Sequence, residues 1–207
     1  MRNILIVGIL FVGCSTIFKK GEKVNVVIPE ESFKAGKELF EKGKYRDAIN
    51  KFKEVLYVKG FGPLANESQY YIAESYLKMG DYDQAILEFR TLVESYTGLS
   101  DSLRAKAFLG LAEAYNKKHK NLYLDVSEID NGIYYAQRVK EMGIFTEKAD
   151  SILKEINYKK ATKLLLEADV YYKLKILRSW KLYLEEFLKL YPDDPRVDSV
   201  RALLGEK

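Results

Sequence analysis

The chain has 207 residues, of which 47% are hydrophobic and 31% are charged, a composition typical of a globular protein. Its 13 Gly and 4 Pro are too few for a collagen-like or low-complexity chain. A single Cys excludes an internal disulfide, and a single His excludes any site that needs two histidines. The formal net charge of +4 is too small to indicate nucleic-acid binding.

The amino-terminal residues have the pattern of a cleaved, lipid-modified leader. Arg2 precedes a nine-residue apolar run, 4–12, which has the length of a secretory hydrophobic segment and is far shorter than the roughly 20 residues that span a bilayer. Val12-Gly13-Cys14 resembles the bacterial lipobox, in which the cysteine is diacylated and becomes the first mature residue. We therefore expect a signal peptide over 1–13, lipidation of Cys14 and a lipidated tether over 14–29. A buried amino-terminal strand that contains a Cys is the alternative.

The next residue bears on the destination of such a lipoprotein. Ser15 follows Cys14, and the sorting rule of bacterial lipoproteins then implies the outer membrane. The expected location is thus the periplasmic face of the outer membrane, reached through the lipid anchor.

A motif recurs in the rest of the chain, where apolar residues follow helical spacing and no useful strand pattern appears. Gly-Lys-Tyr-Arg-Asp-Ala at 43–48, with Phe52, matches Gly-Asp-Tyr-Asp-Gln-Ala at 80–85, with Phe89, 37 residues later. Glycine can end a helix in the left-handed conformation, alanine lets two helices approach, and phenylalanine fills the gap between them. This is the spacing of the tetratricopeptide repeat, and it predicts stacked helical hairpins over 30–207.

The later repeats depart from the motif. Ala-Glu-Ala-Tyr at 112–115 matches 73–76 and begins a third hairpin, whose turn is expected to be a longer polar loop over 116–129 before a helix near 131–142. Helices over about 146–174 and 177–191 would form a fourth hairpin, and 197–204 a terminal helix. Lys175, Leu177 and Trp180 stand where the motif has Gly, Tyr and Ala, and we interpret Trp180 as a core residue.

The lipobox cysteine, the tether and the hairpins together resemble the BamD-type (YfiO-like) outer-membrane assembly lipoproteins. Residues 33–57, 70–96 and 167–195 carry the likeness, the last of these ending in Tyr-Pro-Asp-Asp-Pro. The resemblance implies an all-α, tetratricopeptide-type right-handed α-solenoid of about four hairpins plus a terminal helix. It also implies a periplasmic scaffold of the β-barrel assembly machinery, whose partners are a β-barrel assembly protein with periplasmic domains and unfolded outer-membrane protein segments. This chain is shorter than the usual members and lacks a complete fifth hairpin.

A groove lined by first-helix residues is the expected binding surface of such an array. Aromatic side chains and single charges at these positions suit an extended peptide with aromatic side chains. Burial of the same aromatics in the core is the alternative. The expected groove residues are Phe33, Lys37, Phe40, Glu41, Tyr70, Glu74, Leu77 and Lys78, followed in the third hairpin by Leu109, Glu113, Asn116 and Lys117.

A basic face is expected in the fourth hairpin. The segment 154–189 holds nine basic and five acidic residues, a surplus that could meet an acidic partner domain or anionic head groups. A solvated helix face is the alternative. The residues expected to form the face are Lys159, Lys160, Lys163, Lys173, Lys175, Arg178 and Lys181.

Motifs for catalysis are missing from the sequence. It contains no glycine-rich phosphate loop, no GxSxG elbow, no Ser/His/Asp set and no metal-ligand spacing. We therefore expect a protein that is not an enzyme and has no cofactor or metal. The alternatives are a tetratricopeptide lipoprotein of cell-envelope maintenance that binds peptidoglycan-associated proteins, a helical cell-wall hydrolase, and a soluble adaptor.

Overall fold

The computed structural model describes residues 27–59, 62–118 and 128–205. The expected signal peptide, Cys14 and nearly all of the expected tether lie outside these residues. The described residues form nine helices and no strand, which confirms the all-helical prediction, and none of these helices could cross a bilayer by length and apolarity. The helices are α1 (Pro29–Glu41), α2 (Tyr45–Lys59), α3 (Pro63–Met79), α4 (Tyr82–Ser95), α5 (Asp101–Lys118), α6 (Ile129–Glu141), α7 (Thr146–Lys173), α8 (Leu177–Leu190) and α9 (Val197–Leu204).

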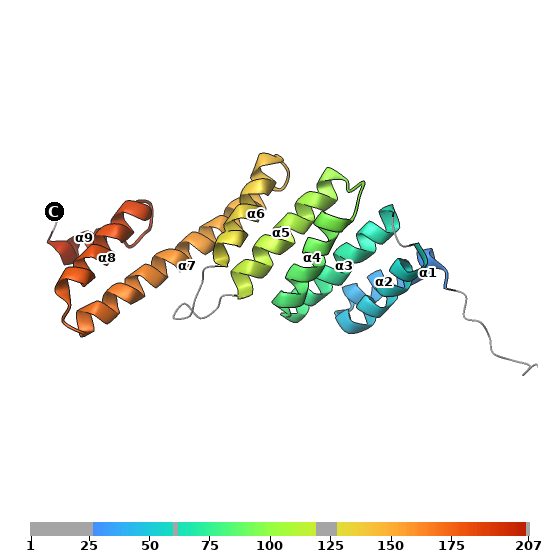
Figure 1. The fold of residues 1–207 in the computed structure, drawn as a ribbon, viewed down its shortest axis with the longest axis horizontal. Coiled ribbons are helices and arrows are strands. Elements are labelled where there is room, and N and C mark those ends of the chain that lie inside the picture. The colour runs from blue at the N-terminus through green and yellow to red at the C-terminus, as the bar shows by residue number, and fades with distance from the viewer. Residues whose placement is uncertain (1–26, 60–61, 119–127, 206–207) are drawn as a thin grey trace, which may run out of the picture.

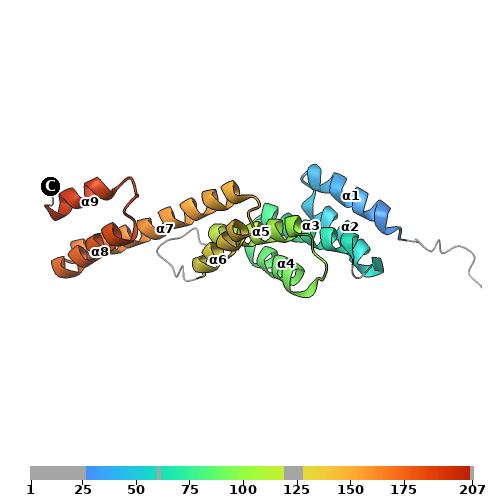
Figure 2. The ribbon, with the colours of Figure 1, turned by 90° about the horizontal axis from the view of Figure 1, so that it is seen from above.

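The helices form an elongated array of antiparallel hairpins, with α1 at one end and α8 and α9 at the other (Figure 1). Each helix packs against the next, and the odd-numbered helices α1, α3, α5 and α7 also contact one another in order. Among the described residues no two even-numbered helices are in contact, and Figure 2 shows α4, α6 and α8 below the row of α3, α5 and α7. The array therefore curves with α1, α3 and α5 on its inner face.

Residues in the left-handed conformation end the first helix of three hairpins. Gly43 after α1 and Gly80 after α3 have φ of 73° and 80°, and the Gly80 N–H donates to the Leu77 carbonyl oxygen at 3.1 Å. Glycine adopts this conformation without steric cost, as the motif predicted. In the fourth hairpin Lys175 takes the glycine position at φ 60° and has the less favourable conformation of a non-glycine residue.

The alanine and phenylalanine of the motif form the centres of the first two hairpins, as predicted. Ala48, Phe52, Ala85 and Phe89 are all fully buried. A Cβ atom added to Gly36 of α1 would lie 2.7 Å from the nearest atom of the Phe52 ring, so that only glycine fits at this crossing of α1 and α2.

The start of the predicted polar loop was wrong, because α5 continues to Lys118. Asn116, expected in the loop, is helical and buried, and both its carbonyl oxygen and its Oδ1 accept hydrogen bonds from Lys159 Nζ of α7, at 2.9 and 2.7 Å. This link between distant residues keeps the end of α5 helical. The next helix, α6, begins at Ile129, two residues before the predicted start.

The fourth hairpin and the terminal helix were predicted to within one residue at every end. Helix α8 contacts only α7 and α9, so that the 28-residue α7 connects this unit to the rest of the array. The unit has a core of its own, which confirms that Trp180 packs against core residues. The fully or nearly fully buried members of that core are Ala161, Ala168, Leu184, Phe187, Val197 and Val200.

Candidate binding groove

A cavity of about 490 Å³ opens on the inner face between α1, α3 and the start of α5. The helix contacts α1·α3 and α3·α5 bring its walls together. Helix α3 contributes the central wall, because Asn66 and Tyr70 are four residues apart and lie on the same face of this helix. The lining residues are Lys37 from α1, Pro63, Asn66, Glu67, Tyr70 and Tyr71 from α3, and Gly98, Ser100, Ser102, Leu103 and Lys106 from the α4–α5 connection and α5.

Asn66 contributes a buried polar side chain to the wall of this cavity. The side chain is only 3% exposed, and its Nδ2 donates to the Thr97 carbonyl oxygen at 3.4 Å. Its Oδ1 is buried and has no hydrogen-bond partner. A buried polar atom without a partner costs about 1–3 kcal/mol.

Aromatic rings form the floor of the cavity. Tyr70 and Tyr71 contact each other edge to face with ring centroids 5.4 Å apart, and Lys37 Nζ lies 5.4 Å from the centroid of the Tyr71 ring. Burial, followed by the charge of Glu74, raises the pKa of the Tyr70 hydroxyl, which therefore stays protonated throughout the physiological pH range. The floor thus offers apolar ring surface, and the Tyr70 hydroxyl is already hydrogen-bonded to the Glu74 side chain.

A buried polar network holds α3 against α4 behind the cavity. Gln69 Nε2 donates to the Glu88 backbone carbonyl oxygen at 3.1 Å and to Glu88 Oε2 at 2.7 Å, and the Tyr96 hydroxyl donates to Gln69 Oε1 at 3.4 Å. Because both ends of the Gln69 amide are bonded, the network stabilises the packing of α3 against α4.

Two of the residues expected in the groove line the cavity, Lys37 and Tyr70. Phe33 and Phe40 instead pack on the first core cluster, Phe33 at 5.7 Å from Phe52 and Phe40 at 5.3 Å from Tyr71 between ring centroids. Their partial burial agrees with the alternative interpretation, in which these aromatic side chains belong to the core.

Most of the other expected groove residues lie in the core or in surface ion pairs, whereas Glu41 is exposed. Leu77 is 4% exposed and belongs to the core, so it offers a ligand no surface. Glu74 pairs with Lys78 at 3.3 Å along α3. In the third hairpin Glu113 pairs with Lys117 at 2.5 Å, Leu109 packs on the core and Asn116 is buried against Lys159.

Sequence reasoning missed Asn66, Tyr71 and Lys106. Asn66 precedes Tyr70 by four residues and Ala73 by seven, a spacing that places all three on one helix face and could have indicated its role. Tyr71 was not distinguishable from a core residue, since its ring also stacks on Phe52 at 5.2 Å. Lys106 enters the site only because α5 packs against α3.

The expected basic face is largely compensated by acidic side chains. Lys159, Lys163, Lys173 and Lys181 each pair with a carboxylate four residues away on the same helix, and Lys160 pairs with Asp130 of α6 at 2.6 Å. Lys159 also bonds Asn116, as described above. The remaining two members, Lys175 and Arg178, lie at the α7–α8 turn, where both are exposed.

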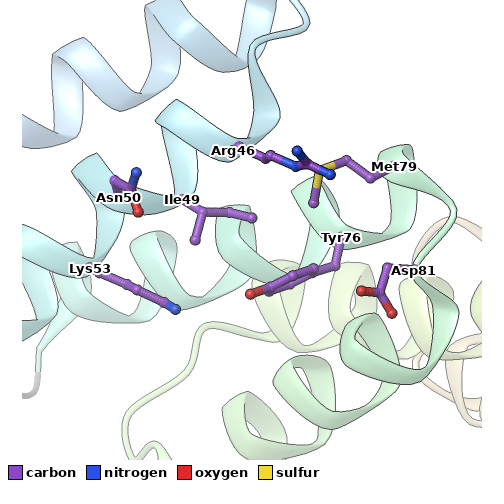
Figure 3. A pocket seen from close by; sticks show the side chains of 7 residues that line it. All are labelled: Arg46, Ile49, Asn50, Lys53, Tyr76, Met79 and Asp81. Atoms are coloured by element: carbon purple, nitrogen blue, oxygen red, sulfur yellow. The ribbon is translucent and has the colours of Figure 1, made fainter.

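A second cavity, of about 470 Å³, lies between α2 and the carboxyl end of α3 (Figure 3). Arg46, Ile49, Asn50 and Lys53 of α2 face Tyr76 and Met79 of α3 and Asp81 beyond it in this view. The carboxylate of Asp81 already caps α4 by accepting a hydrogen bond from the Gln84 N–H at 3.3 Å. The cavity therefore offers two exposed cations, Arg46 and Lys53, beside an apolar floor.

A family-model match agrees with this geometry. The family model described as a tetratricopeptide repeat matches residues 33–96 and, in an overlapping match, residues 70–121. No curated protein matches the chain significantly. Among solved structures, a thermophilic tetratricopeptide repeat protein of Thermus thermophilus is similar to this chain at 18% identity, over 86% of this chain and 100% of that chain, with a TM-score of 0.46.

The fold is thus an all-α solenoid of the tetratricopeptide type, and residues 33–121 carry tetratricopeptide repeats. Repeats of this kind indicate a scaffold for protein–protein interaction.

Proposed function

We propose that the inner groove binds an extended segment of a partner protein and that the protein acts as a scaffold without catalysis. The observation that carries this proposal is the cavity of about 490 Å³ on the inner face of the array, which is lined by the Tyr70 and Tyr71 rings and by Lys37 and Lys106. An extended segment of a partner protein fits a groove with such a lining.

The lining of the cavity defines the chemistry of the bound segment. Tyr70 and Tyr71 suit an aromatic or aliphatic side chain, and Lys37 and Lys106 suit a carboxylate, whereas Glu67 is the only acidic residue in the lining. The proposed ligand is therefore an extended peptide segment with apolar side chains and at least one acidic group.

The location and the partner are part of the same proposal. The lipobox-like residues 12–14 support diacylation of Cys14 and attachment to the periplasmic face of the outer membrane. Together with the repeats, they support a role in the β-barrel assembly machinery, where the partner is an assembly protein with periplasmic domains and unfolded outer-membrane protein segments are further ligands.

Lipidation is tested separately from the groove. Cells that express the full chain are grown with labelled palmitate, and the label is expected in the mature protein and absent from a Cys14→Ala variant. The mass of the mature protein should also show removal of residues 1–13. Equal labelling of the variant would contradict lipidation at Cys14.

The groove is tested by charge reversal at its rim. A Lys37→Glu, Lys106→Glu double variant changes two side chains that line the cavity outside the core, so the fold should persist. We expect at least a tenfold loss of partner in crosslinked co-purification from detergent-solubilised envelopes. Lys34→Glu, an exposed change elsewhere on α1, is the matched control. Recovery of a barrel-assembly protein at wild-type level with the double variant would contradict the proposed groove, and recovery only of peptidoglycan-linked proteins would contradict the assembly role.

A further inference from the structure

The turn between α7 and α8 exposes an unusual density of apolar side chains. Of the fifteen large apolar side chains that are exposed in the described part of the chain, five fall within eight residues, 170–177. Leu174 and Leu177, next to the turn itself, are 62% and 57% exposed. We call residues 170–181 the tip. Its exposed apolar side chains are Val170, Tyr172, Leu174, Ile176 and Leu177.

The fold fixes the tip in this exposed position. Lys175 reverses the chain at φ 60°, and the Ile176 N–H closes the turn by donating to the Tyr171 carbonyl oxygen at 3.0 Å. No described helix other than α7 and α9 packs against α8, and Figure 1 shows the turn at the end of the array far from α1. The tip therefore projects from the end of the array, and no other described element covers its exposed apolar residues.

The equivalent turn of the second hairpin has different chemistry. Between α3 and α4, Gly80 takes the place of Lys175, Asp81 that of Ile176, and Tyr82, which is half-buried, that of Leu177. Turn architecture alone thus does not require exposed aliphatic residues. They are a particular property of the tip.

Positive charge surrounds these apolar residues. Lys173 pairs with Asp169 and Lys181 with Glu185, both along the helices. Lys175 and Arg178 lie within 4 Å of no carboxylate among the described residues. Exposed aliphatic side chains with cations beside them are the combination that anchors a protein segment to an anionic membrane surface.

We propose that the tip inserts into the interface of an anionic lipid bilayer. Leu174, Ile176 and Leu177 enter the outer part of the acyl region, while Lys175 and Arg178 meet lipid phosphates. Trp180 and Tyr172, with ring centroids 5.5 Å apart, lie where aromatic residues reside at the head-group level. A second copy of this chain is a poorer occupant, because a symmetric contact through the tip would bring Lys175 and Arg178 against the same cations of the other copy.

Trp180 makes the proposal directly measurable, because it is the only tryptophan of the chain. Its emission reports on the tip alone, even where another segment attaches the protein to the membrane. The full chain is mixed with vesicles of phosphatidylcholine and phosphatidylglycerol, with or without brominated acyl chains that quench tryptophan on contact. We expect a blue shift and quenching with these vesicles, and at least tenfold weaker binding to phosphatidylcholine alone.

Variants at exposed positions separate the apolar and the ionic contributions. Leu174→Ser with Leu177→Ser should weaken the vesicle-dependent quenching at least tenfold. Lys175→Asn with Arg178→Gln should weaken it by about fivefold for each cation removed, and asparagine tolerates the left-handed conformation at position 175. Leu87→Ser, an exposed leucine of α4, is the matched control and should leave the quenching unchanged. Circular dichroism checks that each variant keeps its helices.

Three results would overturn the proposal. The first is that Trp180 emission does not respond to anionic vesicles although the protein sediments with them, which would place attachment elsewhere. The second is equal quenching in the wild type and in the Leu174→Ser, Leu177→Ser variant. The third is a blue shift that grows with protein concentration in the absence of vesicles, which would assign the tip to self-association.

Discussion

The ring of Phe89 in α4 lies so close over Gly110 in α5 that a Cβ atom at position 110 would overlap it. Counted from Ala73 and Ala112, Gly110 stands where the preceding repeat has Tyr71, whose ring stacks on Phe52. At the contact between the second and third hairpins, α5 therefore places a glycine against Phe89. At the equivalent contact between the first and second hairpins, α3 places the Tyr71 ring against Phe52.

This contact predicts that a methyl group added at position 110 destabilises the protein. Gly110→Ala should lower the free energy of unfolding by about 1–3 kcal/mol, because Phe89 is fully buried and has no room to move. In an open helix the same change would raise stability by about 1 kcal/mol. Urea unfolding followed by circular dichroism measures the difference, with the exposed Ser102→Ala in the same helix as the control. A more stable Gly110→Ala variant would contradict the observed contact.

Lys175 predicts a stabilising change. Lys175→Gly should raise the free energy of unfolding by about 1 kcal/mol, since glycine adopts φ 60° without the cost that a side chain incurs. Gly80→Ala at the equivalent turn, φ 80°, should lower it by a similar amount. Thermal unfolding of both variants checks the pair. If both changes shift the melting temperature in the same direction, the left-handed turn does not govern stability at these positions.

The connection between α8 and α9 predicts a pH dependence. Arg196 donates to both carboxylate oxygens of Asp194 at 2.7 Å and to Thr162 Oγ1 at 2.8 Å, and its guanidinium lies 4.4 Å from the centroid of the Tyr158 ring. The side-chain hydrogen bonds from Arg196 are the main reason that the pKa of Asp194 lies below its ordinary value. A depressed pKa in the folded state means that the stabilisation is complete above the ordinary value of about 3.9 and is lost as the pH falls through the lower folded pKa.

Asp194→Asn should therefore lower the free energy of unfolding by about 1.5–3 kcal/mol at neutral pH, the range of a hydrogen bond to a charged group. The gap between wild type and variant should close as the pH is lowered below about 4. Urea titrations over this range measure it, with the exposed Asp193→Asn as the control. A gap that is independent of pH would show that the ionic contact does not contribute.

Asn66 predicts a gain in stability. Asn66→Leu keeps the number and branching of the side-chain heavy atoms and removes the unsatisfied Oδ1, so the free energy of unfolding should rise by about 1 kcal/mol. The lost bond to the Thr97 carbonyl is replaced by water, because Thr97 is exposed. Thermal unfolding measures the effect, and a destabilised variant would show that the Asn66 amide contributes more to the fold than its unsatisfied oxygen costs.

The sequence predicts the parts of the fold that depend on local chemistry. The 37-residue recurrence placed Gly43 and Gly80 at left-handed turns, and Ala48 and Phe52 in the core, because each position has a steric requirement that few residues meet. The ends of α7, α8 and α9 follow from helical periodicity and from the prolines at 192 and 195.

Contacts between residues that are far apart in the sequence cannot be predicted from such local patterns. Asn116 looked like the start of a loop because its partner, Lys159, lies 43 residues away. The charge of Lys160 is likewise compensated by the carboxylate of Asp130, which lies on another helix. Whether an aromatic ring faces the core or the groove depends on the rotation of its helix, which follows from packing against several other helices.

Site-specific photo-crosslinking in intact cells tests the central claim most directly. A photo-reactive amino acid is placed at Lys106, on the rim of the groove, or at Leu87 on the exposed face of α4. The crosslinked partners are then identified by mass spectrometry. The account predicts that position 106 crosslinks to a β-barrel assembly protein with periplasmic domains and that position 87 does not. An absence of crosslinks from position 106, or the same partners from both positions, would contradict a partner segment bound in the groove.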